Sequence, residues 1–230
     1  MPTRQDDSSS PLPFFPDSYG PGRRQFDFVE YSRDLTALAS NHLRTNVPSA
    51  AAAATRAVHE QAEAVLKAYP EERALVACAA GCSHCCIMNV AVLAPEAVAI
   101  AEHLQQTLAP EQRLALQGKL QELNAATAAT SHGERLALQL PCAFLDERGY
   151  CAIHPVRPLL CRRATSIDPR DCRRALERQG HGEEVPIVAD LFHERLFEEA
   201  FLALARALEE RGLSSASGRL SEEVLRRLED

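Results

Sequence analysis

The sequence contains no tryptophan, and aromatic residues make up only 5% of the chain. Alanine and leucine supply most of the apolar residues instead, and both favour helix. No apolar run reaches the roughly 18 residues that a membrane span requires. The first 16 residues lack the apolar segment of a signal peptide. We therefore expect no membrane partner and a cytoplasmic location.

The sequence also lacks an excess of positive charge, since its formal net charge is −7. That balance argues against a protein that binds nucleic acid by bulk electrostatic attraction. We find neither a glycine-rich nucleotide loop nor an internal repeat of supersecondary length. At 230 residues, 46% of them hydrophobic, the chain is long enough for one large domain with appendages.

Helical periodicity dominates the chain, so we expect a mostly α fold. The pattern predicts helices over 26–44, 48–69, 168–180 and 186–211, with others opening at Pro95 and Pro110. The last two should pack as an antiparallel pair. We expect a disordered tail over 1–25, a single helical domain over 26–212, and a flexible joint with a terminal helix, capped by Ser221, over 213–230.

Eight cysteines are the chemical focus of the sequence. They fall into two groups, written C-x3-C-x2-C-C and C-x8-C-x9-C-x10-C. In a reducing compartment, such cysteines more often bind metal or act in redox chemistry than form disulfides. A short loop can turn its thiols onto one point, about 2.3 Å from a zinc ion, and a distant loop can complete the shell. The ligand candidates are Cys78, Cys82, Cys85, Cys86, Cys142, Cys151, Cys161 and Cys172.

This spacing suits zinc and iron–sulfur clusters equally. Adjacent side chains tend to point apart, so Cys85 and Cys86 indicate either a centre with more than one metal or a spare thiol. We expect two irregular cysteine-rich loops, within 78–172, joined through metal. Cys172 lies in the first turn of a predicted helix and is the weakest candidate.

The cysteine pattern resembles the YkgJ-type cysteine-cluster family, whose members are described as zinc- or iron-chelating domains. The resemblance covers the segments Cys78–Cys86, Pro141–Leu145, Gly149–His154 and Arg157–Arg162. Family members often have tyrosine where this chain has His154. The resemblance implies metal binding through the cysteines. A flagellin lysine methylase has a related cluster, so methyl transfer is one activity that the resemblance permits.

Charged residues within the motifs are candidates for groups that support the metal ligands. Arg157, Arg162 and the neighbouring Arg163 would offset the negative charge of a four-thiolate site, bind an anionic substrate, or simply lie on the surface. His84 and His154 could bind the metal, but we expect them to lie near it without binding it or on the surface.

Three functions follow from these observations. The first is a metal-binding protein that holds zinc or iron, with a protein partner left open. The second is an iron–sulfur enzyme for methyl transfer or redox chemistry, although the scarcity of predicted strands argues against a radical enzyme. The third is a thiol-based redox switch.

Overall fold

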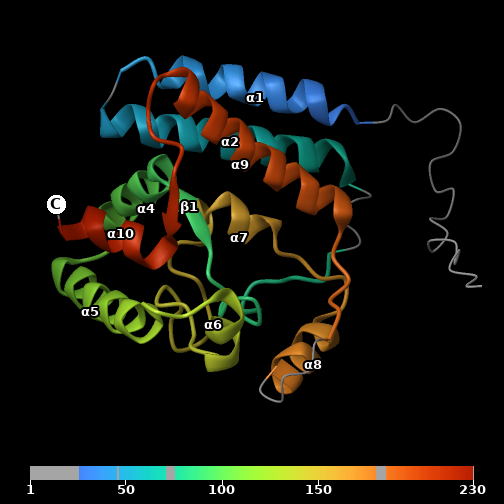
Figure 1. The fold of residues 1–230 in the computed structure, drawn as a ribbon, viewed down its shortest axis with the longest axis vertical. Coiled ribbons are helices and arrows are strands. Elements are labelled where there is room, and N and C mark those ends of the chain that lie inside the picture. Colours follow the sequence, from blue (N-terminus) through green and yellow to red (C-terminus); the bar gives the residue numbers. More distant parts are fainter. Residues whose placement is uncertain (1–25, 46, 71–75, 180–184, 230) are drawn as a thin grey trace, which may run out of the picture.

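The computed structural model describes residues 26–45, 47–70, 76–179 and 185–229. The predicted tail over 1–25 lies outside these residues. The mostly α fold is confirmed (Figure 1). The elements are α1 (Phe28–His42), α2 (Pro48–Ala68), β1 (Ala91–Leu93), α4 (Ala94–Thr107), α5 (Pro110–Thr127), α6 (His132–Leu138), the 3₁₀ turn η1 (His154–Val156), α7 (Leu159–Arg163), α8 (Pro169–Gln179), α9 (Leu191–Glu210), β2 (Ser217–Arg219) and α10 (Leu220–Glu229).

The first hydrophobic core lies between α1, α2 and α9, which run side by side in Figure 1. Helix α1 begins where Asp27 Oδ1 accepts hydrogen bonds from the backbone N–H groups of Val29 and Glu30, both at 2.9 Å. Small and medium apolar side chains fill the space between the helices, among them Leu35, Ala39, Val58 and Leu204. Helices α4 and α7 close this core on the side that faces the cysteine loops.

A second core forms between α4, α5 and α10, beside the cysteine segments. Its buried residues come from all of these parts: Val92, Ile100, Leu104, Leu116, Leu120, Phe144, Ile153, Leu220 and Val224. The prediction that α4 and α5 pack as a pair is wrong. Helix α10 packs against both, and the two have little direct contact. The terminal helix supplies the apolar surface that each of them needs.

The C-terminal segment is tied to the body through a short sheet. Strand β2 pairs antiparallel with β1, with Ala91 opposite Arg219. The backbone N–H of Leu220 also donates to Val90 O at 2.9 Å. Three residues of the predicted joint and terminal helix thus form a strand, and α10 begins at Leu220, one residue before the predicted cap. Independent motion of 213–230 stays a prediction.

Two further helices differ from expectation. Helix α9 begins at Leu191 rather than at Pro186, because Asp190 caps it by accepting a hydrogen bond from His193 N at 2.7 Å. Helix α6 was not predicted, and its N-terminus is a capping box formed by Ser131 and Glu134. Among the described residues, no helix has the length and apolar character needed to cross a membrane.

Candidate metal centre

The first cysteine loop is a series of tight turns between residue 77 and β1. Backbone hydrogen bonds close three of them: Cys82 N to Ala79 O at 3.0 Å, Cys86 N to Ser83 O at 2.9 Å, and Met88 N to Cys85 O at 3.2 Å. Gly81 has φ +85°, a conformation that side chains rarely adopt. This compact backbone keeps the four thiols of the loop close together.

The second cysteine segment begins with a small hairpin. Leu145 and Cys151 form an antiparallel bridge, and Ala152 N donates to Phe144 O at 2.8 Å. Asp146 Oδ1 holds the turn by accepting from the N–H groups of Arg148 and Tyr150. The hairpin therefore brings Cys142 and Cys151, nine positions apart in sequence, to the same place.

Backbone contacts join the two cysteine segments directly. Cys142 N donates to Cys86 O at 2.7 Å, and Ala77 N donates to Ser166 O at 2.9 Å. A Cβ on Gly149 would lie 3.5 Å from Gly81 O, so the two glycine turns also touch. Backbone contacts within the chain thus link the two cysteine segments.

A cavity of about 290 Å³ lies where these segments meet. Seven of the eight cysteines line it: Cys78, Cys82, Cys85, Cys86, Cys142, Cys151 and Cys161. Among the described residues, however, no three His, Cys, Asp or Glu side chains are already arranged to hold a metal ion. The thiols are gathered at one cavity, and their side chains would have to move before several of them could bind one metal ion.

The adjacent cysteines are hydrogen-bonded to each other, contrary to the expectation that they point apart. The Cys86 thiol donates to Cys85, and this bond, helped by the nearby positive charge of Arg157, lowers the pKa of Cys85. The same bond, together with burial, raises the pKa of Cys86. Of the two thiols, Cys85 is therefore the more easily ionised.

Burial governs the other thiols at the inner end of the cavity. It raises the pKa of Cys142 to about 11 and raises the pKa values of Cys151 and Cys161 as well. These thiols are protonated at neutral pH without a metal. A metal ion that binds them as thiolates must displace their protons.

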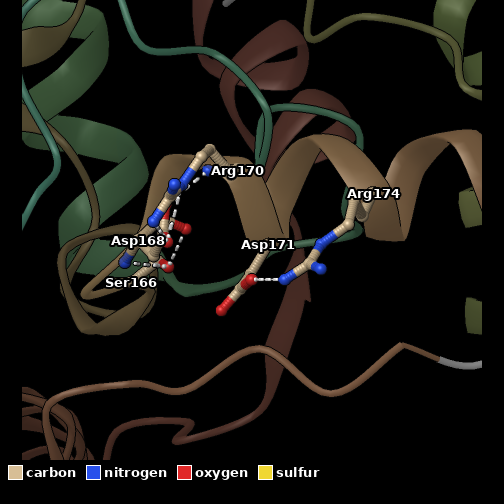
Figure 2. Close-up of polar contacts among 5 residues, drawn as sticks. All are labelled: Ser166, Asp168, Arg170, Asp171 and Arg174. Atoms are coloured by element: carbon tan, nitrogen blue, oxygen red, sulfur yellow. Dashed lines mark hydrogen bonds and ion pairs between the residues drawn. The ribbon is translucent and has the colours of Figure 1, made fainter.

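Cys172 does not line the cavity, although it interacts electrostatically with Cys78. It lies in the first turns of α8, where the predicted helix start is confirmed. Figure 2 shows the side chains that fix this turn: Asp168 accepts from Arg170, and Asp171 pairs with Arg174. Buried Ser166 connects the segment before α8 to the start of the first cysteine loop, because its carbonyl accepts a hydrogen bond from Ala77 N and lies 4.0 Å from Cys78 Sγ.

The predicted arginines have different surroundings. Arg157 lines the cavity, and its charge acts on Cys85, Cys151 and Cys161. Its Nε is buried without a hydrogen-bond partner. Arg162 instead donates to two backbone carbonyls and to Glu63, although its charge also reaches Cys161.

Arg135 on α6 is a charged residue that sequence reasoning missed. It is 2% exposed and lines the cavity, its charge acts on Cys142, and its Nη1 is buried without a partner. Buried donors without partners are rare in proteins, so those of Arg135 and Arg157 point to an anionic group in the cavity. A thiolate-bound metal is such a group, and the residues present fit it.

The two predicted histidines lie at opposite parts of the site. His84 Nδ1 is 3.3 Å from Cys82 Sγ, so it is placed to hydrogen-bond that thiol. His154 lines the cavity, and burial lowers its pKa. His84 therefore lies beside the Cys82 thiol and His154 lines the cavity, while their role beside a metal stays a prediction.

Comparison with known proteins gives one match. Residues 77–180 match the model of the family CxxCxxCC, described as a putative zinc- or iron-chelating domain. No curated protein and no solved structure matches the chain. The matched residues include all eight cysteines and both cysteine segments. The description supports metal binding, and the match confirms the resemblance of this segment to a cysteine-cluster family that was inferred from the sequence.

Proposed function

We propose that this protein binds zinc or iron through the thiolates of its cysteine cavity. One observation carries the proposal: seven cysteines from two distant segments line a single cavity together with two arginines, and one nitrogen of each arginine, Arg135 Nη1 and Arg157 Nε, is buried without a hydrogen-bond partner. The donor chemistry agrees with the family description, since thiolates prefer zinc, copper(I) and iron–sulfur centres to harder cations.

The surroundings of the thiols favour two sets with different roles. Five interact with one another at the inner end of the cavity and are the proposed principal ligands: Cys85, Cys86, Cys142, Cys151 and Cys161. The remaining three, Cys78, Cys82 and Cys172, form an outer set in which Cys78 interacts with both of the others and also with Cys85 of the inner set. This division cuts across the two groups of the sequence, because Cys85 and Cys86 join the second group.

An inner set of five exceeds the four ligands of a tetrahedral zinc ion. A centre with several metal atoms, including an iron–sulfur cluster, would use the fifth thiol and could extend towards the outer set. We propose zinc and iron as the two candidate metals. We also propose a cytoplasmic location, because all eight cysteines are free thiols and such thiols persist in reducing compartments.

Metal analysis of protein purified without air, with a visible absorption spectrum, tests the proposal. Stoichiometric zinc with no colour, or iron with sulfide and a broad visible band, would support it. Protein that holds neither metal and has eight freely reacting thiols would refute it.

A matched pair of substitutions tests the division of the thiols. Cys161→Ser removes an inner thiol, and Cys172→Ser removes an outer thiol from the same half of the chain. We expect the first to lose most of the bound metal and the second to retain it. Equal metal loss in both variants would contradict the inner set.

A further inference from the structure

The cavity has more room than a metal ion needs. A thiolate-bound ion sits about 2.3 Å from its sulfurs and so lies within the shell of side chains that bind it. The cavity of about 290 Å³ is instead close to the smallest pockets that bind organic ligands, which start at roughly 300 Å³. A single metal ion leaves much of this space unexplained.

The chemical character of the walls limits what fills that space. Apolar side chains of the second core form part of the lining, among them Phe144, Ile153 and Leu220. The described residues that line the cavity include three arginines, Arg135, Arg157 and Arg219, and no carboxylate. Such walls favour a ligand that is apolar over most of its surface and carries a negative charge.

Arg135 is the arginine best placed to receive that charge. The guanidinium of Arg219 is already occupied, because it donates to the carbonyls of Thr127 and Thr130 and pairs with Glu222. The charge of Arg157 acts on three thiols, so it would serve to offset the charge of a metal centre bound by them. Arg135 has one thiol neighbour, Cys142, and a buried Nη1 with no partner.

We propose that the cavity binds a small organic carboxylate beside the metal. The carboxylate accepts hydrogen bonds from the Arg135 guanidinium, and the hydrocarbon part packs against Phe144, Ile153 and Leu220. A planar guanidinium matches a carboxylate with two parallel hydrogen bonds. Leu220 lies beyond residue 180, so part of the ligand's surroundings comes from outside the matched family domain. This inference rests on the proposed function only in that both ligands share one cavity.

Hexanoate is a suitable probe, and hexanamide is its uncharged counterpart of the same shape. We expect calorimetry to detect saturable binding of hexanoate to the metal-loaded protein and binding of hexanamide at least about tenfold weaker, because a hydrogen bond to a charged group is lost. Arg135→Gln should weaken hexanoate binding by a similar factor. Arg33→Gln, at an exposed arginine of α1, is the control and should leave binding unchanged.

A second measurement uses the unaltered protein, in case Arg135→Gln fails to fold. Nuclear Overhauser effects between the hexanoate methyl group and the Phe144 ring should appear in the complex. Their absence, no saturable binding, equal binding of hexanamide, or an unaffected Arg135→Gln variant would each overturn the proposal. Tighter binding of inorganic phosphate than of hexanoate would overturn the choice of a carboxylate.

Metal content is measured on every sample, and the titration is repeated after metal removal. Hexanoate binding through Arg135 in a protein that never holds metal would refute the proposed function and leave this inference standing. If the metal-loaded protein did not bind hexanoate, and the Arg135→Gln variant lost its metal, Arg135 would act on the metal centre alone. That result would overturn this inference and leave the proposed function intact.

Discussion

Arg162→Lys should destabilise the protein, because Arg162 holds the turn that precedes α7. The side chain is buried, and each part of its guanidinium has a different partner. Nε donates to Arg157 O at 2.9 Å, Nη2 to Pro155 O at 2.8 Å, and Nη1 to Glu63 Oε1 at 2.6 Å. A lysine ammonium keeps the charge but is a compact group without the planar fork, so it cannot reach all three.

The magnitude follows from the bonds that lysine cannot replace. A hydrogen bond to a charged group contributes about 1.5–3 kcal/mol, and we assume that lysine retains one of the three. The Glu63 side chain is 34% exposed, so water reduces the loss at that end. We therefore expect the free energy of unfolding to fall by about 2–4 kcal/mol.

Urea denaturation of the purified proteins, under reducing conditions at neutral pH, measures this change. Arg56→Lys is the matched control, because the Arg56 side chain is 49% exposed and forms an ion pair with Glu102 at 3.1 Å. That variant should change stability by less than about 1 kcal/mol. If Arg162→Lys stayed within about 0.5 kcal/mol of the unaltered protein, the three bonds would not stabilise the fold as argued.

Two further predictions concern buried carboxylates. Burial raises the pKa of Glu96 to about 7, although both of its oxygens accept backbone hydrogen bonds, from Leu93 and Leu159. Between about pH 4.5 and 7 the folded state keeps a proton that the unfolded state releases. The free energy of unfolding should therefore fall as the pH rises, by up to about 3 kcal/mol. Glu96→Gln should lack this decline in urea titrations at pH 5 and 7.5, and identical declines in the two proteins would contradict the reasoning. Asp190→Ala should cost about 0.5–2 kcal/mol in the same assay, because it removes the cap that accepts from His193 N, and Asp190→Asn should restore most of the loss.

Helix starts marked by local chemistry were predictable from the sequence. The helices that open at Pro95, Pro110 and Pro169 form where the sequence placed them, because proline at the first turn and a neighbouring acid act within a few residues. The start of α9 was placed too early at Pro186, although Asp190 carried a capping signal of its own. The capping box of Ser131 and Glu134 would likewise have revealed α6.

Features that depend on distant residues could not be predicted in this way. Strand β2 forms because Gly218 and its neighbours meet β1, more than a hundred residues earlier in the chain. Helix α10 separates α4 from α5 for the same kind of reason. Nothing near Arg135 in the sequence indicates that α6 turns it towards Cys142. Spacing located the cysteines that meet, but the membership of the inner and outer sets depends on how the two segments contact each other.

The three arginines around α7 illustrate why residue type alone does not give function. The sequence offered the same three alternatives for all of them: charge compensation at a metal site, contact with an anionic substrate, or a place on the surface. Arg157 faces the thiols, Arg162 binds the backbone that carries Arg157, and Arg163 points to α9, where it pairs with Glu194 and Glu198. A short helix sends consecutive side chains in different directions, so neighbours in sequence meet different parts of the fold. If the proposed metal centre is correct, replacing Arg157 should change the metal content of the purified protein. Replacing Arg162 should change it indirectly, through the position of Arg157, and replacing Arg163 should leave the metal content unchanged.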